Sequence, residues 1–173
     1  MDNNYIFQYW EAIQNGTVTV GKWIKTIYEI LVNGLKSGKW DFDEEKANKA
    51  INFIENFCHH SEGRNDLLKL ELWQKAIVSA IFGIMDKRTG YRQFREVFIV
   101  VARKNGKTLF AAAIAAYMAY IDGEYGAKVY FLAPKLDQAD LVYDAFYQIV
   151  QADDELDSIT KKRRSDIYIK EFN

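Results

Sequence analysis

Residues 96–121 constrain the fold of this chain more than any other stretch of the sequence. The stretch starts with a continuous apolar run, residues 97–102, which is typical of a short strand buried on both faces. It ends with an alanine-rich segment, residues 108–121, which strongly favours a helix. The polar sequence Arg-Lys-Asn-Gly-Lys lies between them. This order of strand, loop and helix predicts a phosphate-binding loop.

The residues of this loop suit the chemistry of binding a nucleotide. Gly106 lets the backbone approach an anion closely, and the free N–H groups of the following helix face the phosphates. Lys107 can reach the β- and γ-phosphates, and the Thr108 hydroxyl can ligate Mg²⁺. Val101 stands where the pattern G-x-x-x-x-G-K-[ST] has its first glycine. The alternative interpretation is a basic loop that only links a strand to a helix.

Charge is balanced over the whole chain but is distributed unevenly along it. The formal net charge is −1, which argues neither for nor against a nucleic-acid partner. Residues 87–107 contain seven basic side chains and one acidic one, whereas residues 136–158 contain seven acidic side chains and no lysine or arginine. The basic stretch surrounds the predicted phosphate site, where it would steer anions.

Cysteine usage and hydropathy favour an intracellular protein. Cys58 is the single cysteine, so no intrachain disulfide can form. No apolar run approaches 18 residues, and the first residues lack a signal-peptide pattern, so we expect a soluble protein without a membrane partner. His59 and His60 are adjacent and do not share a helix face, which favours a position at a helix end over a metal site.

Apolar periodicity predicts a helical region over residues 1–64. Helices are expected at residues 5–14 and 19–36, and Asp41 or Asp43 can cap a third helix that Gly63 ends. The face expected to be buried in the second helix is formed by Val20, Trp23, Ile24, Ile27, Ile30, Leu31 and Leu35.

Residues 65–173 predict an α/β domain. Helices are expected at 75–84, 108–121 and 135–150, and strands at 97–102, 127–133 and 165–172. Strands that alternate with helices imply parallel pairing with right-handed crossovers. The predicted fold class is therefore a partial parallel sheet, like that of P-loop NTPases, with flanking helices and a helical region before it.

Trp73 and Gln74 stand ahead of the phosphate-loop strand. A glutamine amide can pair with the donor and the acceptor of an adenine edge at once, and an indole beside it can shield the base. Alternatively, Trp73 is a core residue and Gln74 a solvated helix residue.

From about residue 51 to residue 150, the chain resembles the N-terminal part of the ATPase domain of tailed-bacteriophage terminase large subunits. The resemblance rests on the order and spacing of several motifs. They are FIENFCHHSEG (53–63), LELWQ (70–74), AIFG (80–83), VARKNGKT (101–108) and AAAIAAYMAYIDGEYGAKVYFLAPKLDQA (111–139). The family's modified Walker A motif tolerates loss of the first glycine.

The resemblance implies an ATP- and Mg²⁺-dependent motor that moves DNA into procapsids. It makes Trp73 and Gln74 an adenine-recognition motif, and it matches Arg103 to the Walker A arginine at the γ-phosphate. The implied catalytic residues are Arg103 and Lys107, and Thr108 is the implied metal ligand. The implied nucleotide-binding residues are Trp73, Gln74, Arg103, Lys104, Asn105, Gly106, Lys107 and Thr108. The implied partners are double-stranded DNA, the portal protein, the small terminase subunit and further copies of the chain, in the host cytoplasm.

One part of the family pattern is missing. A terminase ATPase needs a Walker B strand that ends in Asp-Glu, and the closest sequence, Asp153-Asp154-Glu155, continues an amphipathic helix. We therefore expect an acidic helix end there, and an ATPase domain that is incomplete on its C-terminal side and lacks the family's nuclease. Two alternatives remain open: a nucleotide-binding or interaction fragment without turnover, and a small P-loop kinase.

Overall fold

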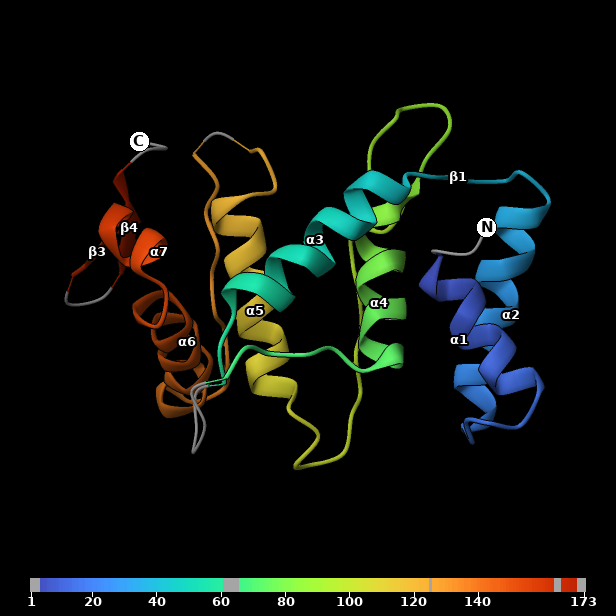
Figure 1. Cartoon of the computed structure of the whole chain (residues 1–173), viewed down its shortest axis with the longest axis horizontal. Coiled ribbons are helices and arrows are strands. Elements are labelled where there is room, and N and C mark those ends of the chain that lie inside the picture. The colour runs from blue at the N-terminus through green and yellow to red at the C-terminus, as the bar shows by residue number, and fades with distance from the viewer. Residues whose placement is uncertain (1–3, 61–65, 125, 164–165, 171–173) are drawn as a thin grey trace. The chain divides into compact units, whose positions relative to one another are not determined.

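The computed structural model describes residues 4–60, 66–124, 126–163 and 166–170 and is mostly helical (Figure 1). The helices are α1 (Tyr5–Gln14), α2 (Lys22–Lys36), α3 (Glu44–Phe57), α4 (Leu72–Gly83), α5 (Lys107–Tyr120), α6 (Leu136–Gln151) and α7 (Asp154–Ile159). The strands are β1 (Asp41–Phe42), β2 (Ile84–Met85), β3 (Thr160–Lys162) and β4 (Ile167–Ile169). The predicted helices are confirmed, with ends that differ by a few residues, except that α3 ends at Phe57 and not at Gly63, which lies outside the described residues.

Contacts divide the chain into two compact units that alternate along the sequence. Unit 1 comprises Met1–Asn52 and Leu70–Ile99, and unit 2 comprises Phe53–Lys69 and Val100–Asn173. The boundary between the units falls inside α3. These units are groups of residues in contact. The predicted division of the sequence into a helical region, 1–64, and an ATPase domain, 65–173, stays a prediction.

Unit 1 is built on the packing of α1 against α2 and α4. Asn4 caps α1, where its side-chain oxygen accepts a hydrogen bond of 2.9 Å from the Ile6 N–H. The aromatic rings of Tyr9 and Tyr28 meet edge to face at 4.8 Å. The core residues are Ile6, Tyr9, Ile13, Tyr28, Leu31, Val32, Ala76 and Ile84.

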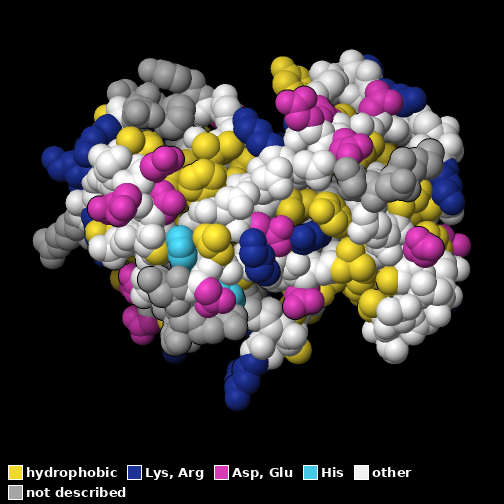
Figure 2. Space-filling model, in the orientation of Figure 1, with side chains coloured by type: hydrophobic (Ala, Val, Ile, Leu, Met, Phe, Trp, Pro, Cys, Tyr) yellow, Lys and Arg dark blue, Asp and Glu magenta, His cyan; other side chains and the backbone are white. Residues whose placement is uncertain are grey.

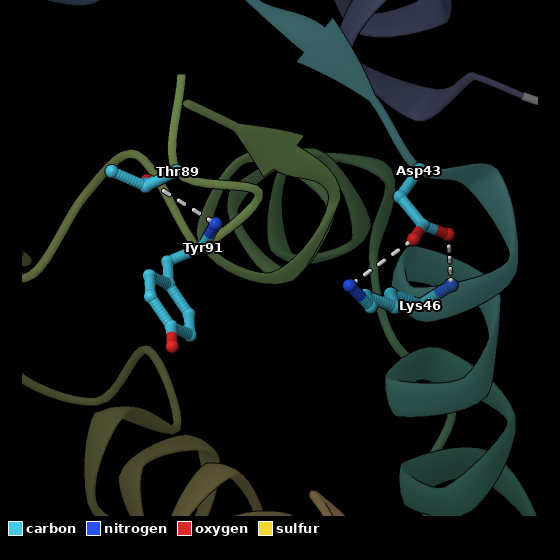
Figure 3. Close-up of polar contacts among 4 residues, drawn as sticks. All are labelled: Asp43, Lys46, Thr89 and Tyr91. Carbon is cyan, nitrogen blue, oxygen red and sulfur yellow. Dashed lines mark hydrogen bonds and ion pairs between the residues drawn. The ribbon is translucent and has the colours of Figure 1, made fainter. Parts of the chain in front are cut away.

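The start of α3 is fixed by Asp43, one of the two predicted caps (Figure 3). Its carboxylate accepts a 3.0 Å hydrogen bond from the Lys46 N–H and lies 3.3 Å from the Lys46 ammonium. Asp41 lies instead in β1, where its carboxylate is 3.5 Å from the Lys87 ammonium.

Strands β1 and β2 form an antiparallel pair that the sequence did not predict. A turn around Gly90 follows β2, and the Tyr91 N–H donates to the Thr89 hydroxyl at 3.3 Å (Figure 3). Asp86 starts this turn, and hydrogen bonds from the backbone and hydroxyl of Thr89 lower the pKa of its carboxyl.

Unit 2 is built on the packing of α5 against α6, which lie side by side (Figure 1). The α5 face is made mostly of buried alanines, which let the helices approach closely. The end of α3 joins the same unit, where the ring of Phe53 lies 5.9 Å from that of Tyr117. Strands β3 and β4 form an antiparallel hairpin, with Lys161 opposite Tyr168.

The predicted parallel sheet is wrong for the described residues, where only antiparallel pairs occur. Residues 97–102 and 127–133 have no assigned strand and are largely exposed; Phe98 and Leu132 are 95% and 92% exposed. An apolar run becomes a buried strand only when strands pair with its edges and other elements cover its faces, and no strand among the described residues pairs with either segment. Part of the third predicted strand is β4, which pairs antiparallel because its partner β3 lies just before it in the chain.

The face predicted to be buried in α2 is also wrong in part. Leu31 is buried, together with Tyr28, Val32 and Gly34. Four residues of the predicted face are exposed instead, namely Trp23, Ile24, Ile27 and Ile30. Apolar residues cover more of the circumference of α2 than α1 can cover, so periodicity alone did not identify the buried side.

The surface is mixed in character. Figure 2 shows basic, acidic and hydrophobic side chains interspersed on the face that it displays. Within the described part of the chain, no helix combines the length and the apolar character needed to cross a membrane.

Candidate phosphate-binding site

The predicted phosphate loop folds as a tight turn directly before α5. Arg103 and Lys104 form the turn, and Gly106 is the N-cap of α5. Gly106 has a φ of +64°, in the left-handed region that favours glycine. Lys104 has a φ of +66°, a conformation that residues with a side chain seldom adopt. The backbone therefore reverses within a few residues and enters α5 at Lys107.

Asn105 holds the loop in this shape. Its side-chain amide donates to the carbonyl oxygens of Ala102 at 3.3 Å and Arg103 at 3.2 Å. We predicted Asn105 as a nucleotide-binding residue, and the side chain is already used within the loop. Any contact that Asn105 makes with a phosphate would come from its backbone N–H.

The start of α5 presents hydrogen-bond donors and positive charge. No side chain caps α5, and the first intrahelical bond comes from the Phe110 N–H to the Gly106 carbonyl at 2.9 Å. The N–H groups of Lys107, Thr108 and Leu109 therefore have no partner within the helix, and the helix dipole adds partial positive charge there. This is the arrangement that binds an anion at a helix N-terminus.

The charged side chains of the loop are free to contact an anion. Arg103, Lys104 and Lys107 are exposed, and none of them forms an ion pair with another described residue. Thr108 is half-buried in the first turn of α5. The structure thus brings together six of the predicted residues, 103–108, at the start of one helix.

The rest of α5 anchors the loop to unit 2. The ring of Tyr120 stacks on that of Phe146 from α6 at 6.2 Å, and its hydroxyl lies 2.6 Å from the Thr160 hydroxyl. Burial raises the pKa of Tyr120 to about 12, so the phenol is neutral at physiological pH. The C-terminal end of α5 is therefore fixed by packing, while its N-terminal end carries the candidate site.

Trp73 and Gln74 lie in unit 1, at the start of α4, and the loop lies in unit 2. The backbone N–H of Glu71 donates to the Gln74 side-chain oxygen at 2.9 Å, and the Glu71 carboxylate accepts from the Gln74 N–H. Gln74 takes part in a reciprocal capping box and is 8% exposed, so it is buried and not solvated. Trp73 is half-buried and packs on the core of unit 1.

Sequence reasoning missed the role of Glu71. The spacing Glu-x-x-Gln before an apolar helix is close to the capping-box pattern and could have indicated it. The two amide N–H donors of Gln74 are not used by the capping box, because only its oxygen accepts. A role in recognising a base thus remains chemically open to this side chain.

The acidic cluster lies at the start of a separate helix, α7, and not at the end of the preceding helix, where the sequence analysis placed it. Helix α6 ends at Gln151, and Asp153 caps α7 by accepting from the N–H groups of Glu155 and Leu156, each at 3.0 Å. Asp154 and Glu155 lie in the first turn of α7. These carboxylates therefore stabilise a helix N-terminus through its dipole and free N–H groups.

Cys58, His59 and His60 follow the end of α3. Cys58 is buried, and its carbonyl accepts a 2.7 Å hydrogen bond from the Leu68 N–H. Burial, with a smaller contribution from the charge of Asp153, raises the pKa of the Cys58 thiol to about 12, so the thiol is not a nucleophile at neutral pH. His59 pairs with Leu67 in an isolated β-bridge. In the described ranges, no three His, Cys, Asp or Glu side chains gather as metal ligands would.

The chain was compared with known proteins of three kinds: solved structures, curated proteins and family models. The crystal structure of the HK97 bacteriophage large terminase matches with a TM-score of 0.63 at 24% sequence identity, over 74% of this chain and 26% of that chain. This chain thus spans about a quarter of the matched terminase, and the likeness shows the fold. No curated protein matched significantly. The family model of the terminase large subunit ATPase domain matches residues 72–171, more than half of the sequence. The chain therefore belongs to the terminase large subunit ATPase domain family.

Proposed function

We propose that this chain binds ATP through residues 103–108 and the start of α5, as the nucleotide-binding part of a phage DNA-packaging motor. The observation that carries the proposal is Gly106, a left-handed N-cap without a side chain, directly followed by Lys107 and Thr108. It leaves the first N–H groups of α5 open to an anion, next to a lysine without an ion pair among the described residues. Family membership supports the nucleotide as the anion.

Each residue of the loop has a distinct role in this proposal. Lys107 contacts the β- and γ-phosphates, and Arg103 neutralises charge that develops on the γ-phosphate. Gly106 and the backbone N–H groups of Lys104 and Asn105 line the phosphates. The Thr108 hydroxyl suits a hard, oxygen-seeking ion and would hold Mg²⁺, which bridges phosphate oxygens.

We also base the proposed sheet segments and the proposed partners on membership of this family. Residues 97–102 and 127–133 carry exposed apolar side chains, and we assign them to the sheet-forming segments of the family's ATPase fold. Double-stranded DNA, the portal protein, the small terminase subunit and further copies of the chain are the proposed partners, and the host cytoplasm is the proposed location.

A second candidate function is nucleotide binding without turnover. It is favoured by Asp153, whose carboxylate caps α7 and is not placed at the end of a strand. Membership of the terminase family leaves no support for the kinase alternative.

Gln74→Glu is expected to lower the preference for ATP over GTP by about two- to tenfold, the value of one hydrogen bond. A carboxylate at this position still accepts the Glu71 N–H and keeps the capping box, but it lacks an N–H donor for the acceptor nitrogen of an adenine edge. Competition calorimetry with ATP and GTP measures the preference. The ratio of the two affinities is the readout, because the added negative charge weakens the binding of ATP and GTP alike.

Gln74→Ala is the matched variant, because it removes the amide together with its hydrogen bond in the capping box. It should lower the preference and also cost about 1 kcal/mol of unfolding free energy, the usual value of a lost cap. An unchanged ATP-to-GTP ratio in Gln74→Glu, at wild-type stability, would restrict Gln74 to the capping box.

A further inference from the structure

Lys104 has an unusual backbone conformation. Among the described residues other than glycine, it alone has a positive φ, at +66°. This conformation brings the Cβ atom close to the following carbonyl oxygen, and it persists only where the surrounding structure holds it. Lysine lacks the short polar side chain with which asparagine or aspartate can stabilise this conformation locally. Lys104 is also exposed, so packing does not hold it. The stabilisation therefore comes from hydrogen bonds within the loop.

The side chain of Asn105 supplies these hydrogen bonds. Its amide nitrogen lies 3.3 Å from the Ala102 carbonyl oxygen and 3.2 Å from that of Arg103. In a trans peptide, the carbonyl points in the opposite direction from the N–H of the next residue. The Asn105 amide holds both carbonyls on its own side, and so it turns the N–H groups of Arg103 and Lys104 away from itself. It thereby fixes the two peptide groups that lead into Lys104.

The result is a loop in which the handedness of the backbone alternates. Lys104 and Gly106 are left-handed, with φ of +66° and +64°, while Asn105 between them is not. Successive N–H groups in such an alternation form a concave site for an anion. This site directly adjoins the N–H groups at the start of α5 that have no partner within the helix.

We propose that Asn105 is a positioning residue, which holds the loop in its nucleotide-binding shape before ATP arrives and makes no side-chain contact with the phosphates. The inference rests on the proposed function. A loop that adopts the competent shape for only part of the time has a dissociation constant raised by the inverse of that fraction. Because Asn105 is exposed, water competes for its hydrogen bonds, and the effect on affinity is modest.

NMR of the chain without nucleotide tests whether Asn105 holds the loop. A positive φ brings the amide and α protons of one residue close together, so Lys104 should give a strong nuclear Overhauser effect between them. Asn105→Ala should weaken this signal. Asn15→Ala is the matched control and should not, because the Asn15 side chain also bonds within a local turn, where it accepts from the Thr17 N–H at 3.0 Å. An unchanged Lys104 signal in Asn105→Ala would overturn the proposal, whether or not the chain binds ATP.

Calorimetry with MgATP separates positioning from direct contact. Asn105→Ala should raise the dissociation constant about two- to tenfold, and Asn15→Ala should leave it unchanged. Lys104→Gly relieves the strain that Asn105 offsets, because glycine adopts a positive φ freely. In the Lys104→Gly chain, Asn105→Ala should therefore raise the dissociation constant less than about twofold.

The outcomes distinguish this proposal from the proposed function. If Asn105→Ala weakens binding by the same factor in both backgrounds, its side chain contacts the nucleotide directly, which would overturn the positioning role. Unchanged affinity in Asn105→Ala, with the Lys104 signal lost, would overturn it as well. A wild-type chain that does not bind MgATP would refute the proposed function, and the positioning role with it.

Discussion

Replacing Lys107 with alanine is expected to weaken MgATP binding about 10- to 150-fold. A charge-assisted hydrogen bond is worth about 1.5–3 kcal/mol, which gives this range of affinity. Lys107 is the first residue of α5, is exposed, and forms no ion pair with any other described residue. Its removal therefore takes a contact from the phosphates without taking one from the fold. Isothermal titration calorimetry measures the change.

The chain offers a closely matched control in Lys22. Lys22 is the first residue of α2, and it also follows a glycine N-cap without a side-chain hydrogen bond. The N-cap there, Gly21, is extended with a φ of −70°, whereas Gly106 is left-handed. Lys22→Ala should leave ATP affinity unchanged. Equal affinities of the wild type and Lys107→Ala would show that the phosphates bind elsewhere.

Turnover of MgATP by this chain is expected to stay within a few-fold of the Lys107→Ala background. Activation of water by a general base typically raises the rate of hydrolysis about 10²–10⁴-fold, and it requires a carboxylate beside the attacking water. The acidic residues of the cluster 153–155 have structural roles instead. Asp153 accepts two backbone N–H groups, and Asp154 and Glu155 occupy the first turn of α7.

Steady-state phosphate release with Mg²⁺ measures the turnover. Asp154→Ala and Glu155→Ala should leave it unchanged, while Asp153→Ala should cost about 1 kcal/mol of unfolding free energy through its lost cap. Turnover at least about a hundredfold above the Lys107→Ala background, abolished by Asp154→Ala or Glu155→Ala, would show that these carboxylates serve catalysis.

The sequence predicted the helices well because their signals are local. Helix α1 was predicted with both ends correct, and α5 within one residue. A cap, a repeat of apolar residues and a glycine stop lie within the segment itself, so no distant residue has to be known. The same holds for the candidate loop, whose glycine, lysine and threonine adjoin a strong helix pattern.

The strands were predicted poorly because pairing is not local. Residues 97–102 and 127–133 have the composition of buried strands but no strand to pair with in the described part of the chain. Strands β1 and β2 are two residues long, too short for an alternating pattern. Their pairing depends on the turn between α2 and α3 and on the close packing of Gly83 against the ring of Phe42.

Gln74 has a structural role that neither interpretation from the sequence included. The sequence offered adenine recognition or a solvated helix position, and the structure shows a third role, a capping box. The signal was the spacing from Glu71, but burial of the side chain depends on tertiary packing. Helix periodicity does not carry that information.

The most direct measurement of phosphate binding is a nitrogen–proton NMR titration of the chain with MgATP. The backbone N–H groups of residues 104–109 are the proposed donors to the phosphates, so their resonances should show the largest shifts, and Lys107→Ala should weaken the titration. Saturable binding that leaves these resonances unmoved, with the shifts located elsewhere, would contradict binding at the start of α5.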